Sequence, residues 1–437
     1  MLDAQKNRGI FQPYLGNSNV RWGAFDFRDL AVMRFEQHEE ERYGLLDGDL
    51  VVCEGGEPGR CAIWQGEVPN IKIQKALHRI RVKDGLDNYF LYYWFLHAGK
   101  TGELEPYFTG TTIKHLTGKA LAELQIPLPP IGRQRGLAKV LRSLDDKIDL
   151  NQRINQTLEA IAQVIFKSWF VDFGPVKAKI AAIGQGQDPL RAAIRAISGK
   201  TDAELDQMPR EHYDQLAIAA ELFPDKMEDS ELGEIPVGWE VKALARVTAY
   251  LNRGISPRYL ESGGVLVLNQ KCIRDFRVDV TKGRRHDPAQ RKIDGRELQL
   301  GDVLVNSTGV GTLGRVAQVL QLDEKAIVDS HVTVIRAGQD LSAPYLGQYI
   351  KWKQPEIEAM GEGSTGQTEL SRSKLAEHLI LKPPKNILNE FDRLICPINE
   401  GTSSKEREAA QLAELRDALL PKLLSGELAI TEQDNEA

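Results

Sequence analysis

The sequence predicts a mixed α+β fold with a pseudo-two-fold internal repeat, in which two loop-rich α+β domains are each followed by a long helix. Three observations indicate this fold: residues that recur at a constant offset, two long heptad patterns in the same register, and short apolar runs broken by glycine, asparagine and proline ahead of each pattern. The 437 residues are enough for two or three domains, each with its own core.

The repeat is read from short matches at an offset of 254 residues. Leu121-Ala122-Glu123 recurs as Leu375-Ala376-Glu377, and Pro129-Pro130 recurs as Pro383-Pro384. Several matches in the same order are not expected by chance, so the two halves are predicted to share one fold. Turns further upstream match with one residue of slippage: Gly48-Asp49-Leu50 with Gly301-Asp302-Val303, and Gly110-Thr111-Thr112 with Gly363-Ser364-Thr365.

A long helical pattern follows each Pro-Pro pair. Seam residues recur alternately four and three positions apart from Leu137 to Trp169, and again from Phe391 to Leu423 without a gap in register. Both seams are apolar at the ends and polar in the middle, so we expect the helices to pair; the alternative is that each is buried separately in its own domain. The seam residues on which this depends are Leu141, Leu144, Ile148, Asn151, Asn155 and Leu158 in the first helix, and Ile395, Ile398, Leu412 and Leu419 in the second.

Two prolines fall within the second pattern. Because proline has no backbone N–H and crowds the preceding turn, we expect Pro397 to kink that helix or to mark its true first turn. For the same reason, Pro421 is expected to disturb the last turn.

The repeat divides the chain into segments with different expected roles. The second loop-rich domain has a lead-in from Trp239 before the stretch that matches Tyr14 to Trp22, and the first has none, so its opening strand is expected to be missing. The linking residues hold short helical stretches and turn signals, which favours a connector with little core of its own. The expected segments are 1–130, first loop-rich domain; 131–173, first helix; 174–235, connector; 236–384, second loop-rich domain; 385–428, second helix; and 429–437, tail.

Composition excludes several classes of protein. No apolar run approaches the length of a membrane span, and Met1 opens on a polar stretch rather than a signal peptide, so the cytoplasm is the expected compartment. The net charge of −6 argues against a protein that simply coats DNA, so any basic clamp would come in part from partners. The four cysteines, which predict neither a disulfide framework nor a zinc site, are Cys53, Cys61, Cys272 and Cys396.

Motifs for catalysis are absent or weak. The chain has neither the glycine-rich cofactor loop nor the Asn/Asp-Pro-Pro-aromatic tetrapeptide of a methyltransferase. Gly99-Lys100-Thr101 and Gly199-Lys200-Thr201 lack the glycine that a phosphate loop requires five residues earlier. Pro224-Asp225 followed by Glu240-Val241-Lys242 fits a loose nuclease pattern, but this pattern is short and common. The eight histidines show no paired spacing, so neither catalysis nor a metal site is expected in this chain.

Four segments resemble a known family, the specificity subunits of type I restriction-modification systems. Residues 166–173 (FKSWFVDF) close the first helix, 232–239 (LGEIPVGW) open the second half, and 423–428 (LLSGEL) close the second helix. Residues 14–22 (YLGNSNVRW) are similar to an early segment of one class of target-recognition domain in this family. The resemblance covers nearly the whole chain. It departs from the family at the start of the helices, where Glu-Gln is common and this chain has Arg133-Gln134.

The resemblance implies a DNA sequence-recognition subunit without catalysis of its own. Two target-recognition domains would each read one half of a split DNA site. The two long helices would form an antiparallel coiled coil that sets the separation of the half-sites and docks two methyltransferase subunits. Motor-nuclease subunits would join this core, with S-adenosylmethionine, ATP and magnesium held by the partners. The alternatives are a stand-alone nuclease or methyltransferase, against which the absent motifs speak, and a coiled-coil scaffold that does not bind DNA, which leaves the two loop-rich domains unexplained.

Candidate DNA-binding residues are polar side chains in glycine-containing loops. Arginine and lysine read guanine, asparagine and glutamine read adenine, and glycine permits close approach to phosphates. The alternative for each residue is a turn-capping role without contact to DNA. The candidates in the first domain are Asn17, Asn19, Arg21, Arg60, Thr111, Thr112 and Lys114, and those in the second are Asn269, Lys271, Ser307, Thr308, Arg315, Ser364, Thr365, Gln367 and Arg372.

Overall fold

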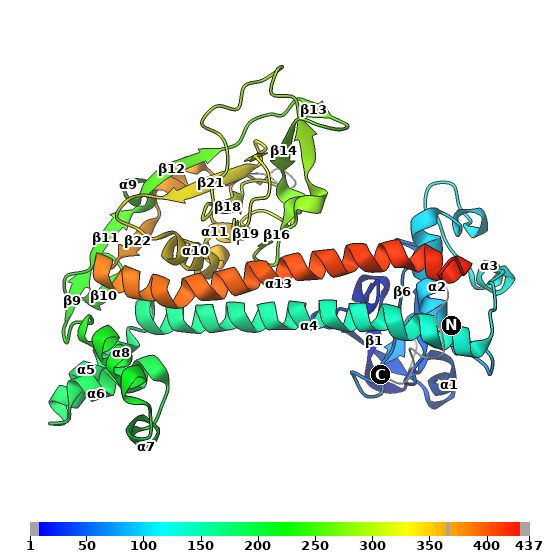
Figure 1. The fold of residues 1–437 in the computed structure, drawn as a ribbon, viewed down its shortest axis with the longest axis horizontal. Coiled ribbons are helices and arrows are strands. Elements are labelled where there is room, and N and C mark those ends of the chain that lie inside the picture. The colour runs from blue at the N-terminus through cyan, green and yellow to red at the C-terminus, as the bar shows by residue number, and fades with distance from the viewer. Residues whose placement is uncertain (1–7, 364–367, 429–437) are drawn as a thin grey trace. The chain divides into compact units, whose positions relative to one another are not determined.

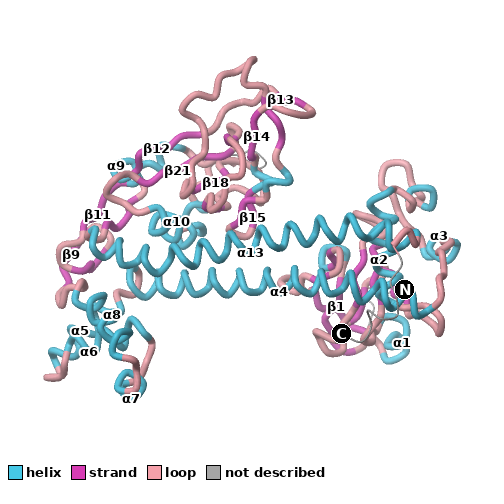
Figure 2. Tube along the Cα trace, in the orientation of Figure 1, coloured by secondary structure: helices cyan, strands magenta, loops and turns pink. Residues whose placement is uncertain are grey.

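A computed structural model of the chain describes residues 8–363 and 368–428 (Figure 1). It divides into a first unit, residues 1–151 with 408–437, and a second unit, residues 152–407. Each unit combines a sheet-containing domain with one segment of each of two long helices, α4 (Ile131–Phe170) and α13 (Lys385–Ser425). The strands lie in the two sheet-containing domains, and no strand interrupts either long helix (Figure 2). The predicted mixed α+β fold with two long helices is confirmed.

The two long helices pair in antiparallel orientation. In the first unit, Leu141 near the start of α4 shares a buried apolar cluster with Leu420 near the end of α13. In the second unit, Phe166 near the end of α4 packs on Phe391 near the start of α13, with ring centroids 6.2 Å apart. Because early residues of one helix meet late residues of the other in both units, the pairing is antiparallel. The alternative of two helices buried separately is excluded.

The predicted seam is the buried face of both helices. Asn155 Nδ2 donates to the Thr402 backbone oxygen at 3.2 Å, so the polar middle of the seam contains a hydrogen bond from one helix to the other. Asn151 is fully buried, and its side-chain amide finds no partner among the described residues. Buried polar groups of this kind favour one register over others at a cost in stability. All the predicted seam residues are buried or half-buried: Leu141, Leu144, Ile148, Asn151, Asn155, Leu158, Ile395, Ile398, Leu412 and Leu419.

The prolines do not set the limits of α13. The helix begins at Lys385, twelve residues before Pro397, and continues past Pro421 to Ser425. The expectations that Pro397 marks the first turn and that Pro421 disturbs the last turn are therefore wrong. Both prolines are exposed, so water can bond the carbonyl group that each leaves without a helical partner. Packing of the opposite face holds the helix together.

The first unit contains two small three-stranded sheets, with orders β4-β1-β7 and β6-β5-β8. Helix α2 packs on β6, and eight of its fourteen residues are buried. Its ends follow from the sequence, because Asp87 accepts a hydrogen bond from the Phe90 N–H at 2.9 Å and Gly102 adopts a positive φ of 81°. The elements are β1 (Ile10–Leu15), η1 (Asn17–Asn19), β2 (Val20–Arg21), β3 (Ala24–Phe25), β4 (Ala31–Phe35), η2 (Gln37–Glu39), α1 (Glu40–Tyr43), β5 (Leu50–Cys53), β6 (Cys61–Ile63), β7 (Lys72–Ile73), β8 (Leu77–Ile80), α2 (Asn88–Thr101), η3 (Glu105–Tyr107) and α3 (Gly118–Glu123).

The sheet domain of the second unit has two four-stranded sheets, with orders β12-β21-β18-β19 and β13-β17-β14-β20. Its aromatic and aliphatic core continues onto α4 and α13 through Phe166, Trp169 and Phe391. The elements are β11 (Glu240–Ala243), α9 (Leu244–Val247), β12 (Thr248–Arg253), β13 (Tyr259–Leu260), β14 (Val265–Leu268), η4 (Gln270–Cys272), β15 (Ile273–Arg274), β16 (Arg277–Val278), η5 (Val280–Lys282), β17 (Arg284–His286), β18 (Val303–Asn306), β19 (Val316–Gln318), β20 (Ala326–Val328), β21 (Val332–Ala337), α10 (Ala343–Trp352), α11 (Gln354–Ala359), α12 (Arg372–Glu377) and β22 (Leu379–Lys382).

The two sheet domains repeat each other element by element. In each domain, one strand is followed by a 3-10 turn and a two-stranded ribbon. That strand pairs in parallel with a later one: β1 with β7 in the first domain, and β14 with β20 in the second. The second domain adds a lead-in of β11, α9 and β12, in which β11 pairs with β22 and β12 pairs with β21. Among the described residues of the first unit, no strand pairs with the outer edge of β8, which corresponds to β21.

The connector is more ordered than its sequence indicated. Residues 174–221 form four helices, and a small buried cluster of Ala193, Ile194, Leu205 and Ala220 holds them together. Arg191 binds both Asp202 and Asp206 at 2.6 Å, which ties α6 to α7. The expectation of little core therefore understated this segment. Its elements are α5 (Gly174–Gly184), α6 (Pro189–Ser198), α7 (Asp202–Asp206) and α8 (Arg210–Glu221), followed by the hairpin of β9 (Met227–Ser230) and β10 (Gly233–Pro236).

Candidate nucleic-acid interface

A loop cluster in the first unit joins the turn after β1 to the loop between β5 and β6. Asn17 Nδ2 donates to the Gly55 backbone oxygen at 3.2 Å, and Arg60 Nη2 donates to the Asn17 backbone oxygen at 2.9 Å. A second nitrogen of Arg60 binds Glu57 at 2.8 Å. Gly56 and Gly59 in this loop both have positive φ, which glycine adopts at little cost. Arg60, only 16% exposed, therefore acts mainly as a brace for the loop that presents Asn17.

The next two candidates differ in orientation. Asn19 is buried; its Oδ1 accepts from the Gly16 N–H at 2.8 Å, and its Nδ2 donates to the Asp26 backbone oxygen at 2.9 Å. This orientation argues against a contact between Asn19 and DNA and favours the turn-capping alternative. Arg21 is 42% exposed and lies 3.6 Å from Asp26. Hydrogen bonds from Arg28 hold the pKa of Asp26 well below its usual value, so this carboxylate stays charged beside Arg21.

The loop from 109 to 115 presents three further candidates to solvent. It is closed by a backbone bridge between Thr109 and His115. Thr111 and Thr112 are exposed, and Lys114 is exposed with its Nζ 3.8 Å from Glu105. These side chains are accessible to a ligand.

The second unit builds the same loop cluster with different side chains. Asn269 occupies the place of Gly16, where its Oδ1 accepts from the Lys271 N–H at 2.8 Å and its Nδ2 donates to the Lys282 backbone oxygen at 3.2 Å. Asn269 is therefore used as a cap, and it leaves Lys271 exposed at the tip of η4. Gln270 Nε2 donates to Thr308 Oγ1 in the loop between β18 and β19.

The loop between β18 and β19 contains three candidates with different exposure. Ser307 is fully buried against Thr333, at 2.6 Å between their hydroxyl oxygens, which argues against contact with DNA. Thr308 also contacts His331 Nδ1 at 2.8 Å, so its hydroxyl is held between two side chains. Arg315 Nη2 donates to the Gly311 backbone oxygen at 2.7 Å and stiffens the loop. Three other candidates, Ser364, Thr365 and Gln367, lie outside the described residues.

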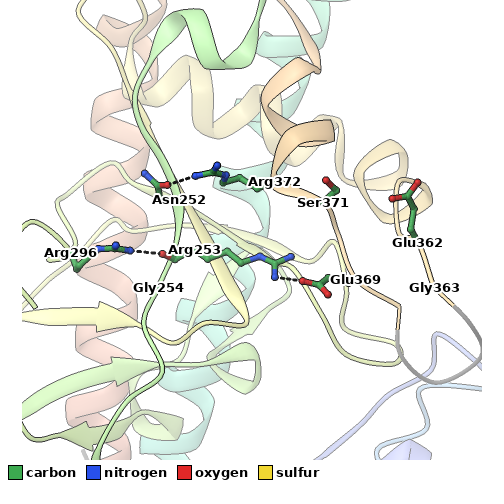
Figure 3. A pocket seen from close by; sticks show the side chains of 9 residues that line it. All are labelled: Asn252, Arg253, Gly254, Arg296, Glu362, Gly363, Glu369, Ser371 and Arg372. Carbon is green, nitrogen blue, oxygen red and sulfur yellow. Dashed lines mark hydrogen bonds and ion pairs between the residues drawn. The ribbon is translucent and has the colours of Figure 1, made fainter. Parts of the chain in front are cut away.

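A groove adjoins this loop cluster in the second unit (Figure 3). It has a volume of about 760 Å³ and lies between the end of β12, the loop before β18 and the segment that leads into α12. Arg253 forms an ion pair with Glu369 and donates to the Leu370 backbone oxygen at 2.6 Å. Glu369 also forms a backbone bridge to Thr308, which connects the groove to the loop cluster.

Two further arginines of the groove are not neutralised by a carboxylate of the described residues. Arg372 Nη1 donates to Asn252 Oδ1 at 2.8 Å, and Arg296 Nη1 donates to the Arg253 backbone oxygen at 3.1 Å. Sequence reasoning found Arg372 and missed Asn252, Arg253 and Arg296. The available signal was that residues 240–253, the lead-in of the second domain, match no stretch in the first half of the sequence.

The weak catalytic signals find no geometric support in the part of the chain that is described. Glu240 Oε2 lies on β11, 3.1 Å from Lys242 Nζ and 3.7 Å from Lys382 Nζ, and hydrogen bonding to Lys242 lowers its pKa. It is therefore half of a surface ion-pair cluster across two strands. No group of three or more histidine, cysteine, aspartate or glutamate side chains within 8–363 and 368–428 is placed to hold a metal ion. No helix in the same ranges is long and apolar enough to cross a membrane.

Comparison with known proteins assigns the family. Residues 5–160 match the family model described as "Type I restriction modification DNA specificity domain". The HindI type I restriction enzyme specificity subunit of Haemophilus influenzae is 32% identical over 334 residues, which are 72% of this chain and 72% of the relative. The chain belongs to this family.

A second specificity subunit and a solved structure are also similar to the chain. The MjaIX specificity subunit of Methanocaldococcus jannaschii is 25% identical over 82% of this chain and 73% of its own length. A crystal structure of a type I restriction-modification S subunit from M. genitalium aligns with a TM-score of 0.49 and 14% identity, over 97% of this chain and 91% of that one. On the strength of the Haemophilus influenzae relative and the family model, the protein is the DNA specificity component of a type I restriction-modification complex, and its family is non-catalytic.

Proposed function

We propose that this specificity subunit reads a bipartite DNA target, with residues 1–130 acting on one half-site and residues 236–384 on the other. The observation that supports this proposal is the repeated loop cluster, because a 3-10 turn and the following inter-strand loop occupy equivalent places in both domains. Their side chains differ: Asn17 and Arg60 in the first correspond to Gln270 and Arg315 in the second. Equivalent scaffolds with different side chains suit the reading of two different sequences.

The exposed candidates are proposed to contact DNA, and the buried ones to shape the loops. Base edges are reached only by side chains at the surface, so Asn19 and Ser307 belong to the supporting set. Residues proposed to contact DNA are Arg21, Thr111, Thr112 and Lys114 in the first domain and Lys271 and Arg372 in the second. Asn17, Arg60, Asn269, Thr308 and Arg315 are proposed to position them.

The helix pair is proposed to dock two methyltransferase subunits, and motor-nuclease subunits to join that assembly. Ile161 on α4 and Leu415 on α13 are related by the offset of the repeat, and they are 44% and 47% exposed. Exposed apolar side chains at repeat-related positions suit two copies of one partner. S-adenosylmethionine, ATP and magnesium are proposed to reside on these partners.

Methylation mapping tests the proposal directly. The chain would be reconstituted with modification subunits, and the adenine methylation of a genome exposed to the complex would be sequenced. We expect a split motif with one methylated adenine in each half. A single uninterrupted motif, or methylation without sequence preference, would contradict the bipartite reading.

A second arm tests the division of labour. Exchange of residues 236–384 for the matching segment of a relative should change one half-site and leave the other unchanged. A change in both would mean that the domains read DNA jointly.

A further inference from the structure

We infer that Arg372 in the groove of the second unit is a specificity-determining residue that reads a guanine, and that Asn252 positions it. The inference rests on the proposed function and names the residue through which the second domain would read one base. Arg372 is exposed, and its only described hydrogen bond is the one to Asn252 at 2.8 Å. Arg372 lines the groove, and its guanidinium points toward Asn252 (Figure 3).

The mix of donors and acceptors along the groove favours a base-pair edge over a phosphate. The groove is lined by Arg253, Arg296 and Arg372 and by two glutamates, of which Glu369 is paired with Arg253 and Glu362 with Lys374. A phosphodiester offers only acceptors, so the acceptor oxygens of these glutamates could form no hydrogen bond with it. The edge of a G·C pair offers both acceptors and a donor in the major groove, which a lining of arginine and carboxylate groups complements.

Among the three arginines, Arg372 is the one prepared for readout. The guanidinium of Arg253 is already occupied by Glu369 and by the Leu370 backbone oxygen. Arg296 bonds to the Arg253 backbone oxygen and steadies the end of β12. Arg372 instead reaches across to the neutral amide of Asn252 on β12, which orients the guanidinium without neutralising it. An oriented, charged fork is the form of arginine that recognises the two acceptors of guanine together.

The test is a selection from randomised duplex DNA by the whole complex. The chain, reconstituted with its modification and restriction partners, would be incubated with a pool of duplexes at fixed salt, and bound DNA would be sequenced. We expect Arg372→Ala to lose, by about 10- to 100-fold, the preference for guanine at one position of one half-site, with all other positions unchanged. Arg372→Lys should lose the same preference while keeping most of the affinity, because lysine keeps the charge but not the fork.

Two further variants separate positioning and charge from readout. Asn252→Ala should weaken the same preference to a smaller extent and leave the other positions intact. Arg246→Ala removes an exposed arginine of the same unit outside the groove, and it should change no base preference.

The outcomes distinguish this inference from the proposed function. If the unaltered complex selects a bipartite sequence but Arg372→Ala retains every preference, or loses affinity equally for all sequences with a lower salt dependence, Arg372 does not read a base. Full recovery by Arg372→Lys would overturn the inference in the same way. A complex that selects no sequence before any substitution would overturn the proposed function, and the inference with it.

Discussion

The two units carry the same repeat, but among the described residues lead-in strands are seen in the second unit and not in the first. Ile380 on β22 is fully buried beside β11. Its counterpart Ile126 is half-buried in an extended segment that pairs with no described strand, and nearby Leu128 is 63% exposed. Likewise β21 is covered by β12 on one side, whereas the matching side of β8 is open among the described residues. At these positions, the same sequence pattern is fully buried where a neighbouring strand completes the sheet and only half-buried where no such strand is described.

The same difference extends to the candidate interface. Both units have the loop cluster. The groove of the second unit is bounded on one side by the end of β12, and the described residues of the first unit contain no strand equivalent to β12.

The largest effect is expected from insertions into the helices. Seven residues added to the polar middle of both α4 and α13 keep the seam in phase and lengthen each helix by about 10 Å, or roughly three base pairs of DNA. The unread gap in the target should grow by that amount in methylation mapping, with both half-sites unchanged. Insertion of two or five residues rotates the seam off its partner and should abolish folding or partner binding. Normal assembly of the heptad variant with the original gap would show that the helices do not set the spacing.

Truncation of core side chains at repeat-related positions should lower the free energy of unfolding by different amounts in the two units. Trp169 and Leu423 are related by the repeat offset and are 1% and 5% exposed. Trp169→Ala should cost the second unit about 3–5 kcal/mol, because it opens a cavity among Phe170, Phe223 and Phe391. Leu423→Ala should cost the first unit about 2–4 kcal/mol. Hydrogen exchange resolved by peptide measures each unit separately, and equal loss of protection in both units after either change would mean that they unfold as one.

A lead-in segment grafted onto the first unit should raise its stability. A copy of residues 240–253 placed ahead of residue 8 through a flexible linker would supply strands beside β8 and beside residues 125–128. We expect the first unit to gain about 1–2 kcal/mol, with slower amide exchange in β8. The matched control carries Leu251→Pro within the graft, because proline cannot donate to a sheet ladder. The same gain from both grafts would mean that strand pairing is not its cause.

The smallest effect on stability is expected from substitution of two carboxylates on α13 whose pKa shifts have opposite signs. In the second unit, burial raises the pKa of Glu406, although Arg277 lies 3.4 Å away. In the first unit, burial opposes but does not overcome the hydrogen bonds from Lys100 and Arg416, which lower the pKa of Asp417. The ionised form is therefore disfavoured by folding at Glu406 and favoured at Asp417.

The two substitutions should accordingly move stability in opposite directions at neutral pH. Glu406→Gln should stabilise the second unit at pH 7, and the gain should vanish once acid protonates Glu406 in both folded and unfolded states. Asp417→Asn should destabilise the first unit at pH 7, and the loss should vanish as pH falls below the folded pKa of Asp417. Hydrogen exchange at pH values spanning the carboxyl range measures both, and a same-sign response would contradict this assignment.

The sequence was sufficient for the repeat, the helix pair and the seam, because heptad spacing and turn residues are local signals. It was misleading at Pro397, where the cost of a missing N–H is outweighed by packing on the opposite face of an exposed turn. The connector core was missed because it consists of a few alanine and isoleucine residues on short helices. The groove was missed because Arg253, Arg296 and Arg372 come together only through sheet pairing, which no local pattern reports.

The side of β8 that no described strand covers has a consequence for handling the protein. An unpaired strand edge is a template on which another chain can add a strand, and this is a common start of aggregation. Arg79 on β8 carries a positive charge and is fixed by bonds to the backbone oxygens of Glu41 and Gly44. Positive side chains on an edge strand repel an approaching copy of the same edge. Neutral replacement of Arg79 is therefore expected to lower the concentration at which the isolated subunit stays in solution, with no change in the bases it selects.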